Sequence, residues 1–434
     1  MAERSEHGTG WRDSVSLLRR NADFRRLFVA SVISLGGDWF LFVALGGLVV
    51  EATGKALAVG VLILSQELPI FFATPWAGWL ADRLDRRRLM IGCDVARAVI
   101  CCSFLLVGPD NLWLAFVLLA VLSVFAAVFD PASSASIPNV VDPEDLPVAN
   151  ALSGSIWGTM LAVGAALGGV IAAVFGRNVA FLVDAASFAL SAFFLMRIHR
   201  SFSEDRTEEE ARVGIIEATT ETARYASRDR RVLALISVKF GFGVAAGVLA
   251  LIAVFAREVY NGGDIAFGLL MAARGVGALI GPFLGHRLSG RNHERLLPAI
   301  ALALTVFGLG YIGLGLTPTL WFAMLTVCVA HLGGGAQWML SSYGLQRLVP
   351  DRIRGRIFAF DYALITLSLA ISSIVTAIVA DAAGPRTAAV LAGSVAVAWA
   401  GLWWVLTRKV RREPLFAGVE DVTPAAPPIT MAVE

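Results

Sequence analysis

The sequence predicts an all-α membrane protein with twelve transmembrane helices in two six-helix, pseudo-symmetric bundles. Of the 434 residues, 57% are hydrophobic and only 16% are charged, whereas soluble domains carry about 25% charged residues. A single soluble core stops growing at about 250–300 residues, so a soluble fold could not bury this much apolar surface. The apolar composition therefore predicts a lipid bilayer as the chain's partner. The net charge is only +2, so we expect no nucleic acid as a partner.

Apolar runs broken by glycine, proline and charged residues define the individual helices. A helix that crosses the hydrocarbon core of a membrane needs about 20 apolar residues. Runs of this kind lie near residues 27–50, 57–81, 89–108, 111–131, 148–175, 179–198, 231–257, 264–288, 296–316, 319–344, 356–382 and 386–407.

Lysine and arginine are distributed unevenly between the two sides of these spans. The loops on one side contain only Lys55, Arg177, Arg257 and Arg386, whereas those on the side of the termini carry clusters of arginine. Because positively charged loops stay inside, we expect a multi-pass protein of the cell (inner) membrane with both termini in the cytoplasm. The first 23 residues are polar, so we expect no cleaved signal peptide.

A long polar segment divides the spans into two groups of six. It covers residues 199–230 and is rich in glutamate and arginine. We therefore expect a domain order that places two bundles around this cytoplasmic linker, which would contain an amphipathic helix. The expected parts are a cytoplasmic N-terminal segment at 1–23, bundles at 24–198 and 231–407, the linker at 199–230, and a disordered cytoplasmic tail at 408–434.

Two short patterns recur at one offset in the two groups of spans. Pro75-x-x-Gly78 is repeated as Pro282-x-x-Gly285, and 282 − 75 = 207. The pair Pro143-Glu144 is repeated as Pro350-Asp351, and 350 − 143 is also 207. The common offset predicts a duplicated six-helix unit, which is typical of one large transporter architecture.

The stretch after the second span carries a signature. Residues 78–88 read Gly-Trp-Leu-Ala-Asp-Arg-Leu-Asp-Arg-Arg-Arg. This run resembles the loop between helices 2 and 3 of the major facilitator superfamily, roughly G-x-x-x-D-R-x-G-R-[KR], with Asp85 in place of the second glycine. Its D-R-x-D-R-R form is similar to the branch that includes enterobactin-type and macrolide-type exporters. The resemblance covers about residues 21–407 and implies the major facilitator fold.

The resemblance also implies roles for the loop residues. Gly78, Asp82, Arg83 and Arg86 would form a gate on the cytoplasmic side. Asp82 would accept hydrogen bonds from the N-terminus of a neighbouring helix, where the helix dipole is positive. Arg83 and Arg86 would hold carboxylates across the seam between the bundles. The alternative is a cytoplasmic turn that obeys the positive-inside rule.

Five ionisable residues lie deep inside apolar spans: Asp38, Glu67, Lys239, Arg274 and His331. Charges at membrane depth are costly and therefore mark functional sites, and the resemblance places all five at or near the central cavity. A carboxylate removed from water binds a proton more readily, so Asp38 or Glu67 is a candidate for coupling transport to protons. The alternatives are a helix-packing hydrogen bond for Asp38, an ion pair for Glu67 and a packed polar role for His331.

Other membrane residues are better explained by packing or by contact with an apolar substrate. Asp94 and Arg97 stand three residues apart on one helix and are expected to pair, and Asp184 is expected to be structural. Four aromatic residues are candidates for the cavity wall: Trp39, Phe71, Trp157 and Trp338. Such a lining suits amphipathic organic molecules.

The leading hypothesis is a proton-coupled exporter of a small amphipathic compound (a drug, siderophore or lipid-like molecule) that works by alternating access as a monomer. Uptake with a proton, or flipping of a lysolipid, is the alternative in the same class. A membrane receptor that binds without translocation is the alternative of another class. The sequence has no nucleotide-binding loop, and its four cysteines lie in apolar runs, so we expect no cofactor, no metal and no enzyme activity.

Overall fold

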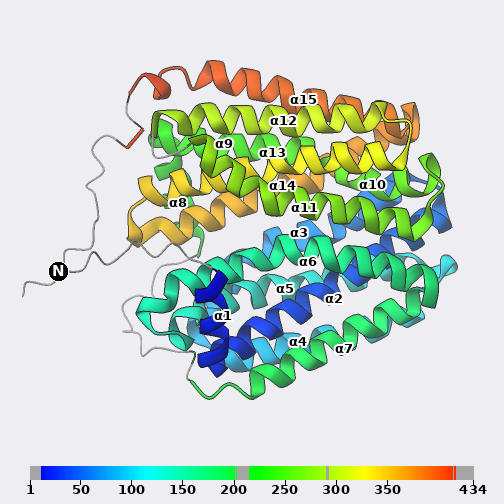
Figure 1. Ribbon diagram of the computed structural model, residues 1–434, viewed down its shortest axis with the longest axis horizontal. Coiled ribbons are helices and arrows are strands. Elements are labelled where there is room, and N and C mark those ends of the chain that lie inside the picture. The colour runs from blue at the N-terminus through cyan, green and yellow to red at the C-terminus, as the bar shows by residue number, and fades with distance from the viewer. Residues whose placement is uncertain (1–10, 201, 203–214, 290–292, 414, 417–434) are drawn as a thin grey trace, which may run out of the picture.

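The computed structural model describes residues 11–200, 202, 215–289, 293–413 and 415–416. Over these residues every regular element is a helix. Twelve of the helices are long and apolar enough to cross a membrane, which confirms the predicted fold class. Two further helices, α1 (Trp11–Arg20) and α8 (Ile215–Arg228), lie at one end of the molecule (Figure 1).

The N-terminal half contributes six of the spanning helices. They are α2 (Ala22–Thr53), α3 (Ala56–Arg83), α4 (Arg86–Ser103), α5 (Trp113–Val140), α6 (Leu146–Phe175) and α7 (Arg177–Met196). Short 3₁₀ turns join some of them, namely η1 (Phe104–Leu106), η2 (Pro109–Asn111) and η3 (Pro143–Asp145).

The C-terminal half begins with a span that changes its winding along its length. It runs from α9 (Arg230–Ala245) through the 3₁₀ segment η5 (Ala246–Ala250) and α10 (Leu251–Val254) to the π-helix η6 (Phe255–Val259). The remaining elements are α11 (Gly263–Ser289), η7 (His293–Arg295), α12 (Leu296–Leu316), α13 (Leu320–Leu348), α14 (Asp351–Ala383), α15 (Pro385–Leu406) and η8 (Val410–Arg412).

The helix bounds repeat at the offset found in the sequence. Adding 207 to the bounds of α3 gives 263–290, and α11 covers Gly263–Ser289; adding 207 to those of α5 gives 320–347, and α13 covers Leu320–Leu348. The turn after α2 also repeats: Gly54 has φ 60° and Asn261, 207 residues later, has φ 54°. Glycine and asparagine adopt this left-handed conformation most easily. The two halves are therefore copies of one unit.

The two halves form two layers, with the C-terminal half above the N-terminal half in Figure 1. Their main contacts are α3 with α14 and α6 with α11. The offset of 207 turns α3 into α11 and α6 into α14, so these two interfaces are equivalent. We call the end where α2 meets α3 the outer end and the end that carries α1 and α8 the inner end, following the orientation expected from the sequence.

Some boundaries differ from those expected. The first span begins at Ala22 rather than 27, directly after the separate helix α1. Helix α8 lies within residues 199–230, and residue 201 and residues 203–214 lie outside the described part. The beginning of the tail is ordered rather than disordered, because Val410 and Leu415 are buried against the C-terminal half. Residues 417–434 lie outside the described part.

Helix packing inside each half depends on glycine. A Cβ atom on Gly393 of α15 would lie 2.5 Å from the carbonyl oxygen of Gly308 on α12. A Cβ atom on Gly401, two turns further along α15, would meet nothing within 4 Å. The two glycines therefore form a matched pair that separates a packing role from a general effect of glycine in a helix.

We expect Gly393→Ala to lower the melting temperature in detergent by several degrees, because forcing α12 and α15 apart costs about 1–3 kcal/mol. Gly401→Ala should leave the melting temperature unchanged or raise it slightly, since alanine favours the helix by about 0.5–1 kcal/mol. Thermal unfolding followed by size-exclusion chromatography measures both variants. Equal melting temperatures for the two variants would contradict this account of the packing.

Candidate functional site

The two halves touch backbone to backbone in the outer half of the molecule. A Cβ atom on Gly275 of α11 would lie 2.3 Å from the amide nitrogen of Ala162 on α6. One on Gly60 of α3 would lie 2.9 Å from the carbonyl oxygen of Ser373 on α14. Such close approach is possible only with small residues, which are the usual means of joining helices in a bilayer.

Charged residues join the two halves at the outer end. Arg177 of α7 donates to Glu51 of α2 at 2.7 Å and lies 3.1 Å from Asp264 of α11. Arg257 of η6 pairs with the same Glu51 and lies 3.5 Å from Asp264. These four residues, which we call the outer latch, alternate in charge and come from both halves.

A helix cap adds a second connection at the same end. Asp381, near the end of α14, accepts hydrogen bonds from the backbone amides of Ala56 at 2.8 Å and Leu57 at 3.0 Å. These amides begin α3, where the helix has no internal acceptors for them and the dipole favours a carboxylate. The C-terminal half thus supplies the N-terminal cap of a helix in the other half.

The same two interfaces separate toward the inner end. The last close contact between α6 and α11 is at Gly158, whose Cβ would lie 3.3 Å from Leu279. One turn further inward, a Cβ on Gly154 would meet nothing within 4 Å. On α14, Tyr362 is 42% exposed although it lies on the face that Ser373 packs against α3. The space between the halves therefore opens toward the inner end.

Arg274 of α11 stands next to Gly275, within the stretch where α11 and α6 are in close contact, and its guanidinium lies near two indole rings of the other half. Its guanidinium carbon is 5.8 Å from the ring centre of Trp39 on α2 and 5.6 Å from that of Trp157 on α6. The two indoles meet edge to face at 6.3 Å. The sequence analysis named all three residues separately, and the structure brings them together across the two halves.

Two buried donors in this group lack a partner among the described residues. They are Nε of Arg274 and Nε1 of Trp39. A buried donor without an acceptor costs about 1–3 kcal/mol, and of the seven buried polar atoms without a partner among the described residues these two belong to neighbouring side chains of opposite halves. Within the described part of the chain, no carboxylate lies within 4.0 Å of Arg274.

Glu67 of α3 is the repeat mate of Arg274, since 274 − 67 = 207. It lies two helical turns inward from Gly60, on the face of α3 that meets α14. Its charge interacts with that of Arg274 and with Tyr362 of α14. The structure therefore places a carboxylate and a guanidinium at equivalent positions of the two halves, near enough for their charges to interact.

Asp38 of α2 lies beside a buried polar network in the N-terminal half. Arg97 donates to Asp94 at 2.5 Å, which confirms the expected pair, and Ser191 of α7 donates to Asp94 at 2.6 Å. Arg97 is sandwiched between two phenyl rings at 4.3 Å each. Asp38 is half-buried and interacts electrostatically with Arg97.

Asp184 of α7 belongs to the same network. It accepts hydrogen bonds from the thiol of Cys101 at 3.1 Å and the hydroxyl of Ser187 at 3.3 Å. A Cβ on Gly37 would lie 2.3 Å from its carboxylate, so Asp184 packs against the backbone next to Asp38. A fully buried acid with neutral partners at this position joins α7 to α2, and its burial agrees with the structural role expected for it.

Two other candidates are fully buried in the C-terminal half. Lys239 of α9 pairs with Asp361 of α14 at 2.5 Å and donates to Ser342 at 2.9 Å. His331 of α13 shares a hydrogen bond of 2.7 Å with the hydroxyl of Tyr311 on α12. Both partners lie in the same half, so these contacts hold that half together, which agrees with the packed polar role considered for His331.

The remaining aromatic candidates lie near these groups. Trp338 of α13 has its ring centre 5.1 Å from the ammonium of Lys239 and stacks edge to face on Phe242. Phe71 lies one turn after Glu67 on α3 and packs against Phe72, which is exposed. Trp338 therefore covers the buried ion pair, and Phe71 follows the face of α3 that carries Glu67.

The expected gate is described in part. The side chains of Asp82 and Arg83 and the surroundings of Gly78 lie outside the described part, although the backbone of all three residues belongs to α3. Arg86 is buried and donates to the carbonyl oxygens of Ala135 at 2.9 Å and Phe202 at 3.4 Å. These contacts of Arg86 are with its own half.

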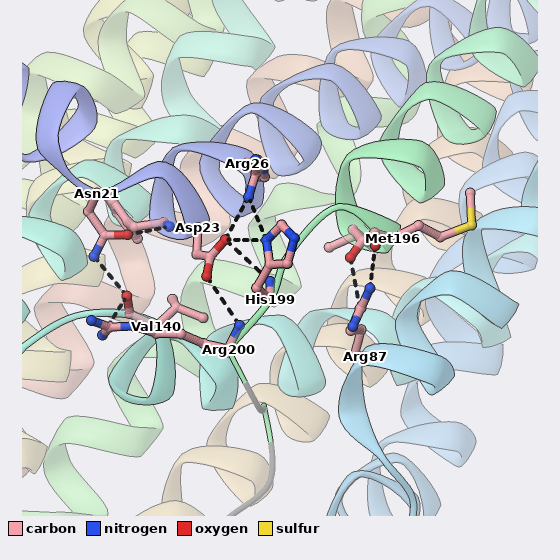
Figure 2. A network of polar contacts seen from close by, with 10 residues as sticks. Asn21, Asp23, Arg26, Arg87, Val140, Met196, His199 and Arg200 are labelled. Atoms are coloured by element: carbon pink, nitrogen blue, oxygen red, sulfur yellow. Dashed lines mark hydrogen bonds and ion pairs between the residues drawn. The ribbon is translucent and has the colours of Figure 1, made fainter.

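The inner end of the N-terminal half carries a dense polar network (Figure 2). Asp23 accepts hydrogen bonds from Arg26 at 2.8 Å and from the backbone amide of Arg200 at 3.1 Å, and Asn21 donates to the carbonyl of Val140 at 2.8 Å. A surface cavity of about 520 Å³ is lined by this network. All of its lining residues belong to the N-terminal half, so it lies outside the space between the halves.

Sequence analysis missed the outer latch and its cap. Arg177 and Arg257 were counted only as loop charges, and Glu51, Asp264 and Asp381 were not singled out. A usable signal was present, because each of these residues stands within a few positions of a span's outer end, and each half carries both acidic and basic residues there.

Comparisons with known proteins agree with this arrangement. A family model described as a transmembrane secretion effector of the major facilitator superfamily matches residues 14–417. The chain is 24% identical to macrolide efflux protein A of Streptococcus pyogenes, over 86% of this chain and 93% of that protein. It is 25% identical to the multidrug efflux pump Tap of Mycolicibacterium fortuitum, over 82% of this chain and 89% of that protein.

The fold is also shared with solved transporters. A POT family transporter, crystallised with a thioalcohol-conjugated peptide, superposes with a TM-score of 0.74 at 13% identity. The match covers 89% of this chain and 96% of that one. At this identity the likeness shows a common fold and carries nothing about the substrate.

The outer latch makes a prediction about conformation. Asp264→Asn removes a charge that faces both arginines, so we expect the outer end to open more often. Spin labels on Asp110→Cys and Thr319→Cys, exposed residues in outer loops of the two halves, report this in a background without Cys102 and Cys328. The distance distribution should extend to longer values in Asp264→Asn and stay unchanged in the control Lys55→Gln. An identical distribution in all three proteins would refute the latch.

Proposed function

Because the chain belongs to the transmembrane secretion effectors, a family of major facilitator superfamily transporters, we propose that it exports a small amphipathic compound in exchange for protons. The observation that carries the proposal is the geometry of the two halves. They are latched at the outer end and separate at the inner end, around Glu67 and Arg274. A transporter that alternates between two openings around a central site has this form in one of its states.

Export is supported by two relatives. The names of both describe efflux, of macrolides in one and of several drugs in the other. Together with the aromatic wall formed by Trp39 and Trp157, this supports an apolar or amphipathic substrate that enters from the inner end. We place both termini and the inner end in the cytoplasm, following the arginine-rich loops.

Asp38 and Glu67 are the carboxylates through which we propose that protons drive the cycle. Each lies on a helix at the interface between the halves, and each is near one arginine, Arg97 or Arg274. A proton that binds from outside would neutralise the carboxylate and weaken its attraction for a positively charged substrate group. Release of the proton to the inside would then reset the site.

We expect Asp38→Asn to lower transport driven by a pH gradient by at least about tenfold, because asparagine cannot exchange a proton. The assay is uptake of radiolabelled erythromycin and of ethidium into proteoliposomes with an acidic lumen. Asp110→Asn, which changes an exposed carboxylate in an outer loop, is the matched control and should behave like the wild type.

Retained gradient-driven transport in Asp38→Asn would exclude this residue as the coupling group, and the same result in Glu67→Gln would exclude proton coupling at either site. Binding of both probes without any uptake by the wild type would overturn the transport proposal itself. Uptake favoured by an acidic exterior would indicate import rather than export.

A further inference from the structure

The central space between the halves has opposite charges on its two sides. Glu67 projects from α3 of the N-terminal half and Arg274 from α11 of the C-terminal half, at positions related by the internal repeat. Both α3 and α11 border the interface between the halves, and the charges of Glu67 and Arg274 interact across it. The pair therefore lies near the centre of the molecule.

The two charges interact, but they do not form a contact ion pair. Any N···O distance between them exceeds 4.0 Å. Two other pairs of membrane charges differ in this respect, because Lys239 with Asp361 and Arg97 with Asp94 form contacts of 2.5 Å within one half. In those pairs each charge is in direct contact with its partner, whereas Glu67 and Arg274 have no such contact with each other and keep their capacity to bind other groups.

The surroundings of Arg274 fit a molecule with an apolar body. Trp39 and Trp157 offer aromatic surface beside the guanidinium. Nε1 of Trp39 and Nε of Arg274 are donors without an acceptor in the described part of the chain. The group formed by Arg274 and Trp39 thus requires an acceptor such as a carboxylate or a carbonyl oxygen, while the carboxylate of Glu67 requires a donor such as an ammonium group.

We infer that this space is a binding site for amphipathic molecules that carry both an amine and an acceptor group, with the amine on Glu67 and the acceptor on Arg274 and Trp39. Such a ligand bridges the two halves, so its binding is coupled to their relative position. A proton on Glu67 competes with the amine. The inference rests on the proposed function, because it names the substrate class of the same central site.

Three probes with one aromatic body test this assignment by equilibrium binding to the purified protein in detergent at neutral pH. Naphthylalanine carries both an ammonium and a carboxylate, its N-acetyl derivative carries only the carboxylate, and its amide carries the ammonium with a carbonyl. We expect naphthylalanine to bind best and the N-acetyl derivative to bind at least about tenfold more weakly, since one charge-assisted hydrogen bond is lost.

The variants should separate the two ends of the ligand. Arg274→Gln should weaken naphthylalanine and the N-acetyl derivative more than the amide, and Arg274→Lys should restore part of the loss. Glu67→Gln should weaken the two amine-bearing probes and spare the N-acetyl derivative. Arg197→Gln is the matched control, because this exposed arginine also lies over an aromatic ring, 4.6 Å from Phe193, but at the inner surface.

Equal affinity of the three probes for the wild type would overturn the inference, as would an equal loss for all three in Arg274→Gln and Glu67→Gln with unchanged melting temperatures. Neither measurement requires a gradient or a vesicle. A wild type that transports erythromycin in exchange for protons but binds the three probes alike would retain the proposed function and refute this inference. Probe selectivity without any transport would refute the proposed function alone.

Discussion

The structure depends on the contacts that hold two apolar bundles together in a lipid bilayer, which is as apolar as the bundles themselves. Lipid offers no hydrophobic gain for association, so helices join through close backbone packing and a few polar contacts. In this protein both the close backbone packing and the polar contacts between the halves are concentrated at the outer end. Glycines at 60, 169 and 275 bring backbones together, and Asp381 caps a helix of the opposite half. Among the described residues these glycine contacts between the halves are not repeated along the same helix faces toward the inner end, and the separation of the halves there follows from this difference.

The arrangement of charges follows the same division. Ion pairs inside one half, such as Lys239 with Asp361, remain intact whichever way the halves move. Pairs between the halves, such as Arg177 with Asp264, must break when the outer end opens. Contacts within a half therefore preserve its shape, and contacts between halves set which state is populated. The alternation of sign in the outer latch makes each of its members dependent on two others.

Much of the fold could be predicted from the sequence because membrane spans have a simple physical signature. Length and hydropathy gave the twelve spans, and the offset of 207 predicted a duplication that the helix bounds reproduce. The pair of Asp94 and Arg97 was predictable because both stand on one helix face. The partner of Lys239 was not, since Asp361 is 122 residues away and no spacing rule connects two different spans.

The faces of the helices were the hardest feature to predict. These spans are apolar on all sides, so periodicity does not show which side meets the other half. Trp39, Trp157 and Arg274 were therefore separate candidates until the structure placed them side by side. The latch residues were misjudged for a related reason, because a charge next to a loop obeys the same topological rule whether it faces water or a partner helix.

The uneven winding of the span that ends in η6 has a mechanical consequence. The five residues of η5 rise about 2.0 Å each, compared with 1.5 Å in an α-helix. Rewinding them as α-helix would shorten the span by about 2.5 Å and draw Arg257 along its axis by the same length. A shift of this size is close to the donor–acceptor distance of a hydrogen bond, so it would separate Arg257 from its carboxylate partners. Rewinding this span would thus withdraw Arg257 from the outer latch, while every backbone amide of the span would still have a carbonyl oxygen as its hydrogen-bond acceptor.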